Sequence, residues 1–543
     1  MDNIARKDMI WKWFWIINFV IQLLLFRSYC FREIIPYIPE NMDQVGYIGV
    51  SYHIYDMFLE GEFIKSFIYA MNNGGNSGMM LVGAINLFIF GFSRFSLLLP
   101  NFIAFFLCQF IVSKILLRIT NSSYVAFIYY GIFLMVKASF VAVGGMFDYR
   151  WDFLAFCVYT IWIGYLLEFL CRNEKRAFYC SAIAGGVLLY IRLNTILYLG
   201  SILLIVFFIK LLSAPPIGKK PYLLSWCKYS GILLVSGGWY LLINFKNFFN
   251  YYFSALFTSS SKEAWQIHMD LKSNIYFYPD ILETALIGKQ ACIIIAILCI
   301  IAITSICFCK KMILKDKKQM FFTLLLAWLV PYAILTIMEN KNSAASMVLI
   351  TGLMLCPVLL LGEMDKKIKI FLPLALTISF LGMATFSLRM MSSYPHHLKE
   401  DAEGYLAAND VIAKYMKTHE MESAEIIFDR LHTNFFRNTI EIYSREAMGR
   451  DIDIDYAIPS MKTDYIMSTF DVEEIEYGLK NTDFLVINAQ QYADTSNFSA
   501  DQILERNSEL LKNYATFHMD LIGESSFGSN QLEIYARRIH DNG

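Results

Sequence analysis

Residues Met79–Phe92 read MMLVGAINLFIFGF, and this stretch decides how the chain is threaded through a membrane. A helix of this length reaches about 21 Å, whereas the hydrocarbon core of a bilayer is about 30 Å thick. We therefore expect a juxtamembrane helix that lies in the interface and belongs to the first outer loop, residues 28–94. Since one crossing more or less reverses the side of every later segment, this interpretation sets the topology of the remaining chain.

The other long apolar runs can cross a bilayer. The sequence of 543 residues is 57% hydrophobic and 17% charged, and these runs extend from Trp11 to Leu388. A spanning helix needs about 20 mostly apolar residues. Suitable runs begin near residues 11, 95, 122, 152, 177, 194, 230, 289, 320, 343 and 368. The expected fold class is a polytopic α-helical membrane protein with about 11 transmembrane helices and a C-terminal soluble α/β domain.

Lysine and arginine accumulate at alternate ends of these runs. Positive residues are enriched in cytoplasmic loops. With eleven spans and a cytoplasmic N-terminus, every inner segment is basic: Arg6–Lys12, Lys114–Arg118, Arg172–Arg176, Lys219–Lys228, Lys310–Lys318 and Lys366–Lys369. Counting residues 79–92 as a span would move most of these segments outside. We expect a multi-pass protein of a bacterial plasma membrane, with the N-terminus in the cytoplasm and the C-terminal domain outside.

Residues 391–543 have the composition of a soluble domain. From Arg389 onward the chain holds 14 Lys and Arg against 27 Asp and Glu, whereas the preceding part holds 32 against 20. A basic transmembrane module, residues 1–390, is thus joined to an acidic extracytoplasmic domain. Alternating strand and helix patterns predict a mostly parallel sheet with helical cover. The alternation of Asp and Ile in Asp451–Asp455 predicts an edge strand with one wet face.

Three carboxylates stand at membrane boundaries that this topology places outside. Asp43 lies in the first outer loop, and Asp148 and Asp152 stand where the run near residue 152 begins. An unpaired charge beside lipid is costly, so an apolar chain places few carboxylates there without a function. The pattern indicates a site that handles a polar substrate next to the bilayer.

The order of these parts resembles the GT-C superfamily of membrane glycosyltransferases, which includes protein mannosyltransferases and lipid A aminoarabinose transferases. Members have an acidic motif in the first outer loop, then a juxtamembrane helix, two spans and a loop with a second acidic residue. Asp43-Gln44-x-x-Tyr47 is similar to the first motif, with Gln44 in place of its second acid. Arg150-Trp151-Asp152 is similar to the second motif. A His-Pro-Pro-Leu segment common in the family is replaced here by Asn73–Ser77.

The resemblance implies an integral membrane glycosyltransferase that takes a sugar from a polyprenyl-phosphate donor on the outer face. A carboxylate that accepts the proton of the acceptor hydroxyl is the general base of such a reaction. Asp43 is our candidate for this base, in a single displacement with inversion. Asp148 or Asp152 would orient the acceptor, position a basic partner or help to hold a divalent metal. The ionised leaving phosphate needs cations, and the outward candidates are Arg150, Arg192, Lys65 and Lys341.

Other interpretations of these residues stay open. Asp43 would then be an ordinary loop acid, Asp152 the cap of its helix, and Arg150 a structural partner of Asp148 or Asp152. Two further function classes also remain, a flippase or transporter of lipid-linked oligosaccharides and a catalytically degenerate scaffold. The outer loop Phe249–Gly288 is long enough to form a lid. We expect no nucleic-acid partner, and the acceptor (a wall polymer, a lipid or a protein) is left open.

Overall fold

The structure is a computed structural model of residues 1–543. It describes all residues except 1, 40–41, 73–76, 214–218, 251–269, 310–317, 339–340, 342, 363–370, 395–398, 430–434, 459–471, 490–507, 528–529 and 539–543. The chain divides into two compact units. The first, here called the membrane unit, contains most of the chain up to Ser393, and the second, the sheet unit, contains Arg32–His53 and Tyr394–Gly543. Each unit is described by itself.

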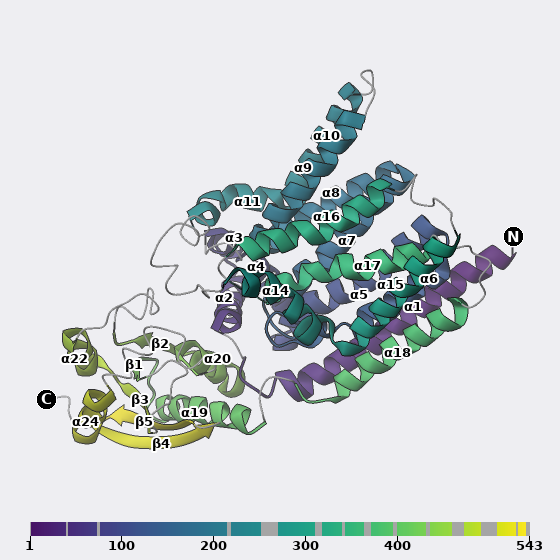
Figure 1. Ribbon diagram of the computed structural model, residues 1–543. Helices are drawn as coiled ribbons and strands as arrows, with labels where there is room; N and C mark the ends of the chain where they lie inside the picture. The colour runs from purple at the N-terminus through teal and green to yellow at the C-terminus, as the bar shows by residue number, and fades with distance from the viewer. Residues whose placement is uncertain are drawn as a thin grey trace. The chain divides into compact units, whose positions relative to one another are not determined.

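The membrane unit is a bundle of helices (Figure 1). Its first helices are α1 (Asp2–Tyr29), α3 (Phe63–Asn72), α4 (Ser77–Phe90), α5 (Arg94–Thr120), α6 (Ser123–Met135), α7 (Asp152–Arg172), α8 (Lys175–Ile191) and α9 (Ile196–Ser213). The later ones are α10 (Lys219–Leu233), α11 (Trp239–Ile243), α14 (Leu271–Ile281), α15 (Lys289–Cys309), α16 (Lys318–Ile337), α17 (Leu349–Gly362) and α18 (Phe371–Met391). Helix α2 (Met42–Leu59) runs from the sheet unit into the membrane unit.

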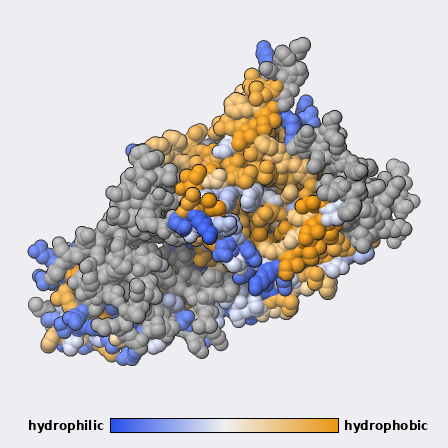
Figure 2. Space-filling view, in the orientation of Figure 1, coloured by the Kyte–Doolittle hydropathy of each residue, from blue (hydrophilic) through white to orange (hydrophobic). Residues whose placement is uncertain are grey.

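Eight helices among the described residues are long and apolar enough to cross a bilayer. They are Trp11–Ile34, Arg94–Thr120, Ser123–Phe140, Asp152–Arg172, Leu193–Leu212, Gln319–Ile337, Ala344–Gly362 and Leu372–Met391. Each corresponds to a predicted run, and Figure 2 shows hydrophobic residues across wide areas of the surface of this unit. The prediction of a polytopic helical membrane protein is therefore confirmed.

Three of the eleven predicted runs are not among the eight helices that meet the length and composition of a span within the described residues. Helix α8 has 17 residues and is slightly shorter than a membrane-spanning helix requires. The run near residue 230 is interrupted after α10 by a π-helical turn, Leu234–Gly238, where Gly237 leaves helical geometry. The run near residue 289 forms α15, a helix of 21 residues, as predicted, and it follows Leu271–Ile287 at a bend of 110°. Counting this bent pair as one span gives nine among the described residues. Apolar composition alone does not reveal such breaks.

The stretch that set the predicted topology forms a separate short helix, α4, of 14 residues. Two tyrosines hold its start: the Gly78 amide donates to the Tyr240 hydroxyl at 3.0 Å, and the Tyr190 hydroxyl donates to the Gly78 carbonyl at 2.8 Å. Farther along α4, a Cβ on Gly83 would lie 1.6 Å from the hydroxyl of Tyr149. Helix α4 is therefore packed closely onto the loop that contains Tyr149, which is the loop of the candidate site.

Helices α6 and α18 cross in close contact through two glycines. A Cβ on Gly131 would lie 2.4 Å from the carbonyl oxygen of Ile378, and one on Gly382 would lie 2.4 Å from that of Gly131. Small residues allow the backbones of membrane helices to approach closely, where packing replaces the hydrophobic effect as the driving force. This crossing joins the last span to the middle of the bundle.

The sheet unit contains a five-stranded sheet of order β2-β1-β3-β5-β4. Its strands are β1 (Ser423–Phe428), β2 (Asp453–Tyr456), β3 (Phe484–Asn488), β4 (Met519–Phe527) and β5 (Asn530–Arg537). Strand β1 pairs in parallel with β2 and β3, whereas β5 pairs antiparallel with β3 and β4. The prediction of a mostly parallel sheet is wrong, because a connection as short as that between β4 and β5 can join only antiparallel strands. The predicted edge strand is confirmed as β2, with Asp453 exposed and Ile454 buried.

Helices complete this unit. They are α19 (Lys399–Thr418), α20 (Arg437–Met448), α22 (Val472–Asn481) and α24 (Ser508–His518), and Figure 1 shows α19 lying along the sheet. Fully buried residues of the central strands, such as Ile426, Val486 and Ile534, form a core with Ile412 of α19 and Leu511 of α24. The unit therefore has a hydrophobic core of its own.

Candidate functional site

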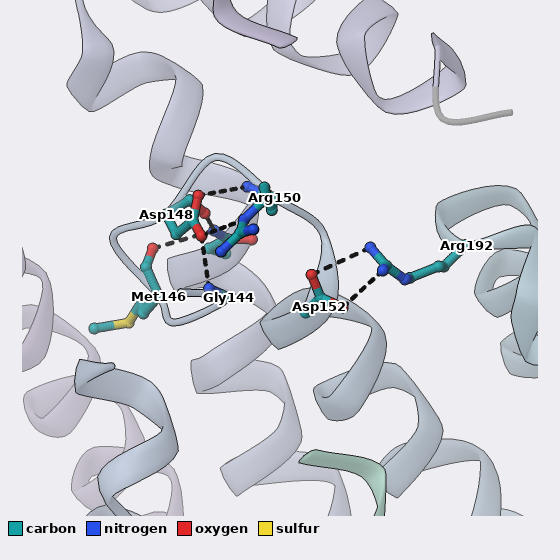
Figure 3. Close-up of polar contacts among 7 residues, drawn as sticks. Gly144, Met146, Asp148, Arg150, Asp152 and Arg192 are labelled. Atoms are coloured by element: carbon teal, nitrogen blue, oxygen red, sulfur yellow. Dashed lines mark hydrogen bonds and ion pairs between the residues drawn. The ribbon is translucent and has the colours of Figure 1, made fainter. Parts of the chain in front are cut away.

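The loop between α6 and α7 folds around the carboxylate of Asp148. This side chain is fully buried, and its Oδ2 accepts from the Gly144 amide and from Nε of Arg150, both at 2.6 Å. Its Oδ1 accepts from the Arg150 amide at 3.2 Å. Figure 3 shows these contacts closing the loop around one carboxylate. Because Arg150 is also nearly buried, Asp148 and Arg150 form a compact ion pair inside the protein.

Gly144 makes this arrangement possible. Its φ of +82° is in the left-handed region that favours glycine. A Cβ at this position would lie 2.4 Å from Cβ of Ala344 and 3.1 Å from Cβ of Asp152. The backbone amide that binds Asp148 therefore comes from a residue that cannot carry a side chain without strain.

Asn101 of α5 supports the same loop from the neighbouring helix. Its Nδ2 donates to the carbonyl oxygens of Met146 at 3.1 Å and Asp148 at 2.9 Å, and the side chain is buried. The sequence interpretation missed both Asn101 and Gly144. An amide within the apolar run of α5 and the pair Gly144-Gly145 next to an acidic loop were the available signals.

A second ion pair lies beside the first one. Asp152 is the first residue of α7, and its two carboxylate oxygens each lie 3.1 Å from a terminal nitrogen of Arg192, the residue directly after α8. The N-cap position of α7 is occupied by Trp151, whose side chain makes no capping bond. The alternative interpretation of Asp152 as the cap of its helix is therefore wrong. The carboxylate instead lies in the first turn, where the helix dipole favours an anion.

The two ion pairs bring two negative and two positive charges together. Burial raises the pKa of Asp148 above its usual range, while Arg150 and the Gly144 amide oppose that rise and the nearby Asp152 adds to it. Two carboxylates and two guanidinium groups thus occupy one boundary of the membrane unit, here called the Asp–Arg cluster: Asp148, Arg150, Asp152 and Arg192 (Figure 3). The Arg192 side chain is 17% exposed, whereas that of Arg150 is 8% exposed. Arg192 is therefore the guanidinium more accessible to a ligand.

The two predicted lysines lie outside this cluster. Lys65 of α3 is largely exposed and forms an ion pair with Glu62. Lys341 donates to the carbonyl oxygens of Leu335, Thr336 and Met338 at 2.7–3.2 Å, which satisfies the carboxyl end of α16. In the structure, both ammonium groups have protein partners.

Asp43 belongs to the sheet unit and lies in the first turn of α2. Val45, Ile48 and Tyr52 form a buried stripe on this helix, whereas Asp43 is exposed. The Tyr52 hydroxyl donates to Oε1 of Glu446 in α20 at 2.5 Å, and the guanidinium of Arg445 lies 5.1 Å from the centre of the Tyr52 ring. Helix α2 thus contacts α20 through Tyr52, and Asp43, nine residues earlier, lies on the opposite side of the helix.

Two other predictions, a divalent metal and a lid, concern features that the described residues do not show. In the part of the chain that is described, no three His, Cys, Asp or Glu side chains gather closely enough to hold a metal ion. Most of the predicted lid, residues 251–269 of Phe249–Gly288, lies outside the described residues. The lid and a divalent metal both stay predictions.

Comparison of the whole structure with solved proteins shows what the arrangement resembles. No protein-family model and no curated protein sequence matches the chain. The fold is similar to the crystal structure of ArnT from Cupriavidus metallidurans in the apo state, with a TM-score of 0.60 and 12% sequence identity, over 96% of this chain and 97% of that one. The structure of the same protein bound to undecaprenyl phosphate aligns with a TM-score of 0.59 and 12% identity, over 97% and 98% of the two chains.

The chain therefore has the fold of ArnT. The alignment extends across nearly the full length of both chains, so the likeness includes the membrane helices as well as the C-terminal sheet. At this low sequence identity the comparison establishes the fold, and the predicted resemblance to the GT-C superfamily is confirmed at that level. An oligosaccharyltransferase from Archaeoglobus fulgidus, in complex with Zn and sulfate, aligns with a TM-score of 0.46 and 12% identity, over 96% of this chain and 73% of that one.

Proposed function

We propose that the protein is a membrane glycosyltransferase that transfers a sugar from a polyprenyl-phosphate donor to an acceptor on the outer face of the membrane. The observation that carries the proposal is the Asp–Arg cluster at a membrane boundary of a GT-C fold. The solved ArnT structure that aligns over nearly the whole chain is bound to undecaprenyl phosphate. A lipid phosphate at a boundary needs cations that remain within reach of the bilayer.

Arg192 is the residue that we assign to the donor phosphate. A guanidinium matches the geometry of phosphate oxygens better than an ammonium does, and Arg192 is more exposed than Arg150. Asp152 would hold Arg192 in place through the bidentate contact at 3.1 Å. Arg150, fixed inside the loop by Asp148, would mainly shape the site. Lys65 and Lys341 are the remaining phosphate candidates, and their existing partners make them weaker ones.

Asp43 is the residue that we assign as general base, in a single displacement with inversion. Its carboxylate is exposed at the start of α2, while the opposite side of the helix is fixed by Tyr52. A base has to reach the acceptor hydroxyl and yet be held in place, and this combination supplies both requirements. The leaving phosphate is already ionised and needs no proton donor, so one carboxylate is sufficient for this reaction.

The test is transfer from a panel of polyprenyl-phosphate sugars by the purified full-length protein. We expect Asp43→Asn to lower the turnover about 10²- to 10⁴-fold, the usual contribution of a general base. The matched control is Glu60→Gln, which neutralises an exposed carboxylate after the same helix and should leave the turnover unchanged. Full activity of Asp43→Asn would contradict the assignment of the base.

The two arginines allow a separate test of the phosphate assignment. Arg192→Lys keeps the charge but removes the two-pronged contact, so we expect weaker use of the donor and a smaller loss of thermal stability than in Arg150→Lys, since Arg192 is the more exposed arginine. Arg150→Lys should mainly lower stability, because it disturbs the buried pair with Asp148. Chelation of divalent metals before the assay shows whether a metal takes part. Vectorial transport of the lipid-linked donor without any transfer would instead favour the flippase alternative, and a lack of both activities would favour a scaffold.

A further inference from the structure

A cavity of about 360 Å³ opens among three membrane-spanning helices of the membrane unit. Leu170 of α7, Val206 and Lys210 of α9, and Phe322 and Thr323 of α16 line it. Most of the wall is apolar, while the Lys210 ammonium, the Thr323 hydroxyl and the Gln319 amide supply polar groups. A cavity of this kind accepts a ligand with an apolar body and a polar head.

The cavity lies at the end of the bundle opposite to the Asp–Arg cluster. Leu170 follows Asp152 by 18 residues along α7, and Lys210 follows Arg192 by the same number through α9. At about 1.5 Å per residue this separation is about 27 Å, close to the thickness of the hydrocarbon core. The cavity is therefore a different site from the candidate active site, at the other boundary of the bilayer.

Lys210 gives the cavity a positive charge. Its ammonium lies 5.8 Å from the centre of the Phe169 ring, and among the described residues no carboxylate pairs with it. In the sequence, residues 310–318, which directly precede Gln319, contain five lysines and one aspartate. Basic clusters beside membrane helices attract anionic lipids. The charge at this end therefore favours an anionic head.

We propose that this cavity binds one anionic phospholipid of the surrounding bilayer. Its phosphate lies on Lys210 within hydrogen-bonding reach of Gln319 or Thr323, and an acyl chain covers Leu170, Val206 and Phe322. A small soluble anion would leave this apolar wall open to water, whereas a lipid covers it. The lipid also joins the ends of α7, α9 and α16, and its binding should stabilise the bundle.

The experiment measures lipid retention by the full-length protein in detergent. Phosphatidylglycerol and phosphatidylcholine with identical acyl chains are titrated separately, and native mass spectrometry counts the lipids bound while thermal unfolding follows stability. We expect wild type to retain one phosphatidylglycerol in preference to phosphatidylcholine. Lys210→Ala should weaken that binding about fivefold or more, the approximate effect of one lysine near an anionic membrane surface.

The matched control is Lys114→Ala. Lys114 of α5 also stacks on an aromatic ring, at 5.7 Å from the centre of Phe110, but it does not line the cavity. It lies toward the same end of the bundle, where Arg118 of α5 pairs with Glu168 of α7. Equal losses in Lys114→Ala and Lys210→Ala would show unspecific attraction and overturn the proposal.

A second variant tests the cavity without changing the charge. Val206→Phe fills the space beside the apolar wall, and we expect it to reduce retention of phosphatidylglycerol although Lys210 is present. Thermal unfolding of each variant without added lipid shows whether it is folded. If folded Val206→Phe retained the lipid as wild type does, or if wild type bound phosphatidylcholine equally well, the proposal would be wrong.

Discussion

Gly144 is a position of the candidate site where the backbone tolerates no side chain. We expect Gly144→Ala to destabilise the protein by about 1–3 kcal/mol, because it adds left-handed strain and a collision with Ala344. The apparent melting temperature in detergent measures this loss, and activity should fall with it. Gly231→Ala is the control, since a Cβ there meets nothing within 4 Å. An unchanged melting temperature of Gly144→Ala would contradict this backbone geometry.

Glu441 provides a pH-dependent prediction at the same scale. Burial raises its pKa from 4.5 to about 7, with the neighbouring Asp453 and Asp455 contributing to the rise, although the Ile454 amide and Arg437 oppose it. The folded sheet unit therefore binds a proton between pH 4.5 and 7 that the unfolded chain releases. Its stability should be greatest below this range and decrease as the pH rises through 7, by at most about 3 kcal/mol.

Hydrogen exchange at the β2 amides of the full-length protein, corrected for the intrinsic rate, measures this decrease. Glu441→Gln stays neutral, so its protection should no longer decrease between pH 5 and 8 beyond that intrinsic change. Asp451→Asn, at a carboxylate that is 75% exposed, should retain the wild-type pH dependence. The same pH dependence in Glu441→Gln as in wild type would assign it to another group.

At the scale of elements, the part of α2 up to His53 contacts α20 within the sheet unit. The contact of Tyr52 with Glu446 and Arg445 holds α2 nine residues after Asp43. We expect Tyr52→Phe and Glu446→Gln each to increase hydrogen exchange in residues 43–53, and the double variant to add little further. A coupling energy of about 1 kcal/mol is reasonable for a hydrogen bond to a carboxylate. Turnover should decrease in parallel if Asp43 is the base, whereas additive effects of the two changes would show that the contact is not formed.

At the scale of the whole molecule, the topology predicts on which side of the membrane each unit lies. All eleven cysteines precede residue 357, so the sheet has none of its own. Asp451→Cys places one thiol at an exposed position of this unit. In intact cells we expect a membrane-impermeant maleimide to label this variant beyond the level of wild type. If this extra labelling required permeabilised cells, the predicted orientation would be reversed.

The sequence by itself determined the membrane class, the short α4, most of the spans and, apart from α20, most helices and strands of the C-terminal unit. These features depend on local composition and periodicity, which a single sequence contains. It also indicated the acidic boundary loops and the GT-C resemblance, because loop order and short motifs are linear properties of the chain. The break at Gly237 within the run near residue 230 was not predicted, since it acts through backbone geometry that an apolar run conceals.

The tertiary structure decided which charges act together. Nothing in the sequence distinguished Arg150, held by Asp148 inside its loop, from Arg192, paired with Asp152 across two helices. The structure also showed that Asn101 supports the loop, that Gly144 must lack a side chain and that β4 and β5 make the sheet mixed. These properties depend on residues that are distant in the chain and close in space. Ion pairing, burial and strand pairing arise only when folding brings such residues together.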